Sequence, residues 1–144
     1  MKTLLRQLSQ DQRGGAIVEF GLLAPLFILM FIAVLQTGMA LQAYNSVRRV
    51  SAETARDVSV QYQTGNRLTT GQIAQLSTSK ATGSPYLLRP NSLEITVEDA
   101  VTQRIPKAKE MTLEIQYTVP TFLDFAGIEG PQLEYSRPIF VSLS

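Results

Sequence analysis

Residues 20–35 read FGLLAPLFILMFIAVL, and this apolar run decides the architecture of the chain. It contains no polar side chain, and no charged residue follows it until Arg48. A helix over the uncharged residues 20–47 is about 42 Å long at ~1.5 Å per residue. This exceeds the roughly 30 Å hydrocarbon core of a bilayer. The sequence therefore predicts one membrane-spanning helix, which we place at residues 15–41.

Beyond this run the helical pattern continues in amphipathic form. Apolar and small residues recur every three or four positions, and charged residues lie mostly between them. We expect residues 42–64 to continue the same helix with one packing face, ended near Gly65-Asn66. That face consists of Ala40, Tyr44, Val47, Ser51, Ala55, Val58 and Tyr62.

Residues 65–144 are expected to form a small β-rich domain. A short second helix is predicted over 70–79, and a loop over 81–85 precedes a change to a period of two. Alternation over 93–98 and 111–119 predicts two half-buried strands, and 132–136 and 139–143 add one or two more, interrupted at Pro138. The predicted fold class is α+β, with a long N-terminal helix packed on three or four antiparallel strands.

The composition excludes several functions. The net charge of +1 gives no basic surface for nucleic acid. Without cysteine or histidine the chain has no disulfides and lacks the commonest general base and metal ligand. No phosphate loop or nucleophile elbow is present, so we expect no enzyme activity, no cofactor and no metal site. The carboxylates Glu94, Glu98, Asp99 and Glu114 are interpreted as a solvated sheet face, and Tyr44 and Tyr62 as core residues.

A cleaved secretory signal is the alternative to a permanent anchor. Gly38-Met39-Ala40 provides a small-x-small cleavage site, but Glu19 lies where the apolar region should begin and Pro25 interrupts it. Basic residues flank the span equally, so charge alone does not define its orientation. They are Lys2, Arg6 and Arg13 before it, and Arg48, Arg49 and Arg56 after it.

The N-terminal motif reads RGGAIVEF from Arg13 to Phe20, followed by GLLAP to Pro25. A basic leader, a glycine, a glutamate in fifth place and an aromatic in sixth resembles the processing site of type IV prepilin-like proteins. The spelling GAIVEFGLLAPLF, with proline six residues after the glutamate, resembles the TadE-like pseudopilins of tight-adherence (Flp) pili. Similarity to that family covers most of the chain. It is strongest over residues 13–60, where residues 51–57 resemble the Ala-Arg-rich stretch at which the family's helix leaves the membrane, and it is weak in the C-terminal strands.

The resemblance implies a pilin-like fold and a minor pseudopilin function in pilus assembly. A prepilin peptidase would remove the leader, residues 1–14, by cutting between Gly14 and Gly15 or one residue later. It also implies a single-pass protein of the bacterial inner membrane, with the leader cytoplasmic and the C-terminal domain extracytoplasmic. Implied partners are the peptidase, other pseudopilins or pilins, the inner-membrane assembly platform and membrane lipid, in homo- or hetero-oligomers.

Further roles follow for single residues. Glu19 and Phe20 would serve processing and subunit contact, with Glu19 pairing to the new α-amine of a neighbouring subunit. Pro25 is expected to kink the helix. The loop residues Leu123, Phe125 and Ile128 are candidates for a partner or membrane contact, against folding back onto the sheet. The alternative function is a membrane-tethered or exported binding domain with no role in a pilus.

Overall fold

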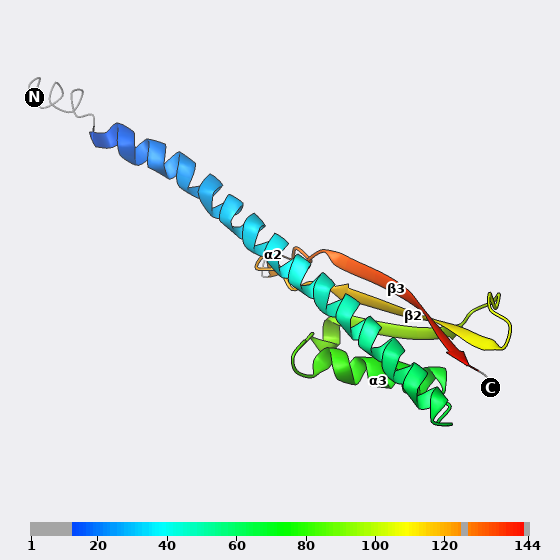
Figure 1. The fold of residues 1–144 in the computed structure, drawn as a ribbon. Helices are drawn as coiled ribbons and strands as arrows, with labels where there is room; N and C mark the ends of the chain where they lie inside the picture. The colour runs from blue at the N-terminus through cyan, green and yellow to red at the C-terminus, as the bar shows by residue number, and fades with distance from the viewer. Residues whose placement is uncertain (1–12, 125–126, 143–144) are drawn as a thin grey trace, which may run out of the picture. The chain divides into compact units, whose positions relative to one another are not determined.

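The computed structural model describes residues 13–124 and 127–142. In chain order the elements are α2 (Arg13–Gln63), α3 (Thr70–Thr82), the 3-10 turn η1 (Pro90–Ser92), β1 (Leu93–Asp99), β2 (Ala108–Thr118) and β3 (Gln132–Ser142) (Figure 1). The predicted α+β fold is confirmed: a long apolar helix precedes a small antiparallel sheet. The chain divides into two compact units, residues 1–37 and residues 38–144.

Helix α2 is continuous through Pro25 and ends two residues before Gly65. Gly65 has φ of +84°, a left-handed conformation that glycine adopts without the steric penalty of a side chain. The Asn66 amide then donates to the Gln61 carbonyl at 2.9 Å, which satisfies one of the free carbonyls of the last turn. The turn therefore closes the helix and redirects the chain toward α3.

Helix α3 begins with a capping box. The Thr69 hydroxyl accepts from the Gln72 amide at 3.3 Å, and the Thr69 amide donates to the Gln72 side chain at 2.8 Å. In its last turn Lys80 forms an ion pair with Asp57 of α2 at 2.7 Å. The helix predicted over 70–79 is thus present and extends to Thr82.

The sheet has the strand order β1-β2-β3, and both pairs are antiparallel. The expected interruption at Pro138 is wrong, because β3 is one strand from Gln132 to Ser142 with Pro138 opposite Thr112. A proline lacks the amide hydrogen that a ladder needs, but an edge strand directs half of its amides away from its partner. Since β3 is an edge strand, it accommodates Pro138 without a break.

The core lies between one face of the sheet and the part of α2 that belongs to residues 38–144. From α2 it receives Val47, Val50 and Val58, and from the central strand Met111, Leu113 and Ile115, all fully buried. Helix α3 adds Ile73. The amphipathic face is therefore real, but it is rotated slightly from the predicted one.

The prediction that Tyr44 belongs to the core is wrong. Its side chain is 38% exposed and meets the edge of the Tyr135 ring at 6.2 Å between centroids. The buried positions are instead Ala43 and Thr54, one residue before the predicted Tyr44 and Ala55. Tyr62, by contrast, is buried as expected and donates from its hydroxyl to the Leu68 carbonyl at 2.8 Å.

Candidate functional site

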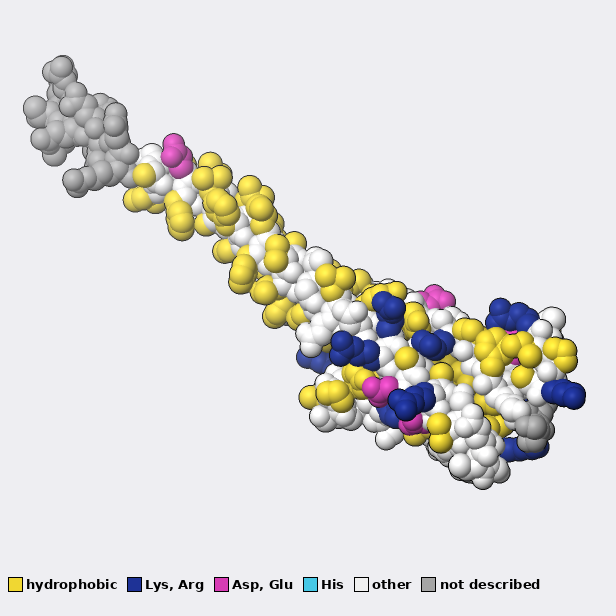
Figure 2. All heavy atoms as spheres, viewed as in Figure 1, with side chains coloured by type: hydrophobic (Ala, Val, Ile, Leu, Met, Phe, Trp, Pro, Cys, Tyr) yellow, Lys and Arg dark blue, Asp and Glu magenta, His cyan; other side chains and the backbone are white. Residues whose placement is uncertain are grey.

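The described part of the first unit, residues 13–37, belongs to an apolar helix whose side chains are mostly exposed. From Ile17 to Leu35 the large hydrophobic side chains are mostly exposed; Phe20, for example, is 73% exposed. Figure 2 shows these side chains in yellow along the helix. The stretch is long and apolar enough to cross a membrane, with a mean hydropathy of 2.5 and none of its most apolar window buried. A helix that is apolar on all sides and has no protein cover fits a membrane anchor.

Glu19 is the sole charged residue between Arg13 and Arg48. It lies within the second turn of α2, and no hydrogen bond or ion pair to it occurs among residues 13–124 and 127–142. A carboxylate near the N-terminal end of a helix is favoured by the helix dipole. Within a bilayer it nevertheless costs up to about 2.5–3.5 kcal/mol at the centre and less toward an end.

Gly14 and Gly15 are both helical, and neither is required by packing. A Cβ built at either position meets no described atom within 4 Å, and neither glycine has a positive φ. The same holds for Gly21. Nothing within the described fold therefore explains the double glycine.

Pro25 lies inside α2 and removes the hydrogen bond to the Gly21 carbonyl. The structure thus places the predicted residues Gly14, Gly15, Glu19, Phe20 and Pro25 on one continuous apolar helix. None of them belongs to the hydrophobic core of the second unit, whose described members lie from Met39 onward.

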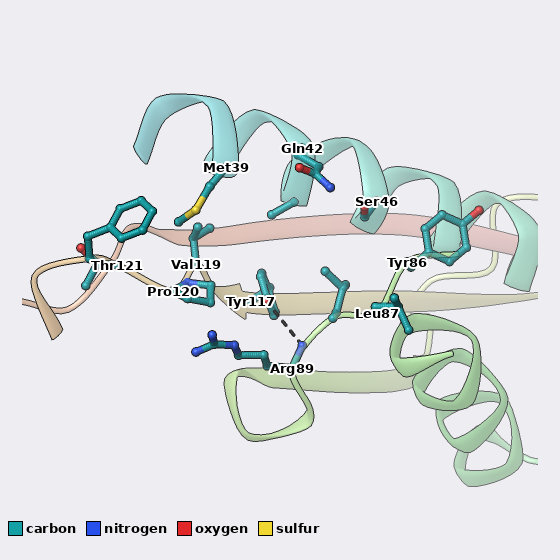
Figure 3. Close-up of a pocket in the computed structure, with 13 residues that line it drawn as sticks. Met39, Gln42, Ser46, Tyr86, Leu87, Arg89, Tyr117, Val119, Pro120 and Thr121 are labelled. Carbon is teal, nitrogen blue, oxygen red and sulfur yellow. Dashed lines mark hydrogen bonds between the residues drawn. The ribbon is translucent and has the colours of Figure 1, made fainter. Parts of the chain in front are cut away.

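A pocket opens at the end of the second unit where its part of α2 begins (Figure 3). Its volume is about 310 Å³. The walls come from α2, the segment after α3, the end of β2 and the loop after it, and they include Met39, Leu87, Tyr117 and Phe122. At its floor the Arg89 amide donates to the Tyr117 hydroxyl at 3.5 Å. No carboxylate lines the pocket, so it suits an apolar guest better than a reaction centre.

The rim of this pocket displays apolar side chains that sequence reasoning missed. Leu87 has φ of +51° and is 70% exposed, and Phe122 is half exposed. Of the predicted loop contacts, Leu123 is half-buried and Ile128 is exposed, while Phe125 lies outside the described residues. Leu87 lies in a segment without helical or strand periodicity, so the sequence pattern did not indicate that its side chain is exposed here.

A hydrogen bond ties this segment to α2. The Tyr86 hydroxyl donates to Glu53 at 2.6 Å. Accepting that bond, the Glu53 carboxylate raises the pKa of Tyr86 above its ordinary value, with desolvation adding to the effect. Within the described ranges no group of three or more acidic, His or Cys residues could hold a metal.

The fold and these features define a class: a small α+β domain that follows an apolar anchor helix bearing one carboxylate. Over residues 14–56 the chain matches the model of a family described as TadE-like protein. This part of the chain is therefore similar to the TadE-like family, and the resemblance seen in the N-terminal motif is confirmed. The match spans less than a third of the chain. Searches of curated proteins and of solved structures gave no match.

Proposed function

We propose that this protein is a minor pseudopilin that acts in assembly of a tight-adherence type IV pilus, by priming, capping or stabilising its base. The observation that carries the proposal is the uncovered apolar helix with Glu19 near its start, inside the TadE-like match. The family match associates the chain with a structural, pilus-related class rather than with enzymes. Anchoring in a membrane agrees with that association.

Processing is the first step of the proposed function. A prepilin peptidase cuts between Gly14 and Gly15, which makes Glu19 the fifth residue and Phe20 the sixth of the mature chain. Glycines without a packing role in the described fold are consistent with selection by a protease rather than by folding. The leader, residues 1–14, then lies in the cytoplasm, residues 15–41 span the inner membrane, and residues 42–64 lead into the extracytoplasmic domain, residues 65–144.

Subunit contact is the second step. Mature copies, or a copy and another pilin of the same system, pack their apolar helices together at the assembly platform. Glu19 of one subunit pairs with the α-amine that cleavage creates on its neighbour. In a medium of low dielectric a matched pair is much less costly than a lone charge, so the pair selects one register of neighbouring helices.

The intact mass and N-terminal sequence of the mature protein test the processing step. We expect a chain that begins at Gly15, or at Ala16 if the cut falls one residue later. A chain that begins at Leu41 would instead identify a secreted module, and an uncleaved Met1 would identify a plain membrane anchor. Either result contradicts the proposal.

Glu19→Gln tests the subunit contact, because it keeps the size of the side chain and removes its charge. We expect cleavage to continue while the amount of the protein recovered with sheared pili or with the assembly platform falls. Glu19→Asp is the matched control, since it retains the charge. Normal recovery of the glutamine variant with its usual partners would refute the pairing.

A further inference from the structure

A groove with an excess of positive charge lies on the α2 side of the domain. Its lining is Asn45, Arg48, Arg49, Ala52 and Arg137, around a shallow volume of about 310 Å³. We call it the arginine groove. No carboxylate lines it, and among the described residues none of its three arginines forms an ion pair. Figure 2 shows Lys and Arg side chains on this face of the domain.

The opposite face of the sheet carries the opposite charge. The side chains that point away from the core include Glu94 and Glu98 of β1, Glu114 of β2 and Glu134 of β3. We call these four residues the acidic face. None of them forms an ion pair among the described residues, and the strands contribute no Lys or Arg to this side. No two of them are directly opposite across a strand pair, so the face carries four spread negative charges.

The two surfaces lie at matching levels along the strands. Gln116 is opposite both Glu94 and Glu134, so these two glutamates share one row of the sheet. Arg137 is three residues from Glu134 on the same strand, a distance of about 10 Å at ~3.3 Å per residue. A second copy in the same orientation therefore brings its acidic face to the groove by a shift perpendicular to the sheet, with a displacement along the strands of no more than about 10 Å.

We propose that the arginine groove of one copy binds the acidic face of a second copy. Charge complementarity supports this partner, because each copy carries arginines on one side and glutamates on the other that form no ion pair among the described residues. Such a contact is heterologous, so it continues from copy to copy and produces a ring or an open filament. Exposed ion pairs are individually weak, and the contact accordingly serves copies held at high local concentration.

This contact goes beyond the proposed function. Peptidase processing and the pairing of Glu19 involve the N-terminal helix, whereas the arginine groove and the acidic face lie within residues 38–144. If the domain contact fails its test, the mature N-terminus is unaffected, and the two failures can be distinguished.

Disulfide cross-linking of full-length chains in detergent tests the proposal, because the natural sequence has no cysteine. Copies with Asn45→Cys in the groove are mixed with differently tagged copies that carry Ser136→Cys on the outer sheet face. We expect oxidation to link the two tags. Thr78→Cys, on the exposed side of α3, replaces Asn45→Cys as the control and should not link to Ser136→Cys.

Charge reversal then tests whether electrostatic attraction causes the contact between the two copies. Arg48→Glu with Arg49→Glu in the groove copy should lower the cross-linked yield about tenfold, since attractive exposed pairs become repulsive. Glu114→Lys with Glu134→Lys in the other copy should do the same, and mixing the two reversed copies should restore the yield. Restoration also shows that both variants are folded. Arg67→Glu, an exposed arginine outside the groove, should leave the yield unchanged.

Three outcomes would overturn the proposal. The first is equal linking from Thr78→Cys, and the second is a yield that the combined reversal does not restore. The third is a change in lipid binding alone. If Arg48→Glu with Arg49→Glu abolishes binding of a water-soluble, short-chain phosphatidylglycerol to the full-length chain in detergent but leaves cross-linking intact, the groove binds anionic headgroups instead of a second copy.

Discussion

Glu110 shows how one residue on the solvated side of a sheet becomes buried. Its side chain is 5% exposed because the loop after β1 folds over it. Arg104 donates to one carboxylate oxygen from Nε at 2.8 Å and forms an ion pair with the same oxygen. The Gln103 side chain accepts from the Glu110 amide at 2.6 Å. The hydrogen bonds from Arg104 hold the pKa of Glu110 below its ordinary value, against the opposing effect of desolvation.

The lowered pKa predicts a loss of stability in acid. Because the folded protein holds this proton less tightly than the unfolded chain, the contribution of Glu110 is complete above the ordinary carboxyl pKa. It disappears as the pH falls through the lowered value. Urea unfolding at pH 7 and at about pH 3.5 should therefore show a smaller difference in midpoint for Glu110→Gln than for the natural chain. An unchanged difference would mean that the carboxylate is not bound by Arg104 in solution.

The two N-terminal glycines allow a sharp residue-scale prediction about processing. A Cβ at either position meets no described atom within 4 Å, so Gly14→Val and Gly15→Val form a matched pair of substitutions. Only Gly14 precedes the proposed cut, and a bulkier first residue is usual in the family that the motif resembles. We expect Gly14→Val to retain the leader and Gly15→Val to be cleaved, as judged by intact mass. The reverse pattern would move the cut to the bond after Gly15.

At the scale of elements, α2 and α3 each bury a hydroxyl group without a hydrogen-bond partner among the described residues. The hydroxyls of Thr54 on α2 and Ser77 on α3 are fully buried and have no hydrogen-bond partner among the described residues. A buried hydroxyl without a partner costs about 1–3 kcal/mol of desolvation. These positions reduce the stability of the packed helices.

Thr54→Val should therefore stabilise the domain by roughly 1 kcal/mol, because valine keeps the branched shape and removes the hydroxyl. The urea midpoint of unfolding measures the change. Thr78→Val is the control. The exposed Thr78 hydroxyl donates to the Ala74 carbonyl at 2.9 Å, and its loss should change the free energy of unfolding by no more than about a few tenths of a kcal/mol. A lower midpoint for Thr54→Val would show that the hydroxyl has a partner in solution.

Much of the element pattern could be read from the sequence, because it depends on local periodicity. The apolar run and the alternation around Leu113 and Ile115 each report one element and its buried face. The predictions that were wrong concern features that depend on tertiary structure. Pro138 is tolerated only because β3 occupies an edge, and Tyr44 lies beside the core because the helix is rotated by less than one residue's arc. The periodicity of the sequence reports neither the edge position of β3 nor the rotation of α2.

The candidate site divides in the same way. Glu19 and its neighbours could be found in the sequence as a linear motif. They lie on one helix, so their spacing along the chain determines their relative positions. The pocket was not visible, because Leu87 and Phe122 belong to loops that meet only after folding. The arginine groove combines Arg48 and Arg49 with Arg137, nearly ninety positions later in the chain. Only the packing of α2 on the sheet brings them together.

At the scale of the whole molecule, the chain divides after Thr37 into a unit that contains the apolar helix and a unit that contains the hydrophobic core. Among the described residues, every member of the hydrophobic core lies in the second unit, from Met39 to Val141. Residues 14–37 contribute no buried residue to it, and their large apolar side chains are mostly exposed, which favours a lipid environment. The free energy of unfolding of the domain should thus be nearly independent of residues 1–37.

A chain that begins at Gly38 tests this independence. We expect it to unfold cooperatively in urea. In the same detergent its free energy of unfolding should lie within about 1 kcal/mol of that of the full-length chain, because no member of the core is lost. A chain that begins at Arg48 is the control. It lacks Ala43 and Val47, and burial of one such valine alone is worth about 1.5–3 kcal/mol, so its midpoint should fall clearly. If the Gly38 chain is as unstable as the Arg48 chain, the apolar helix supports the domain as well as anchoring it.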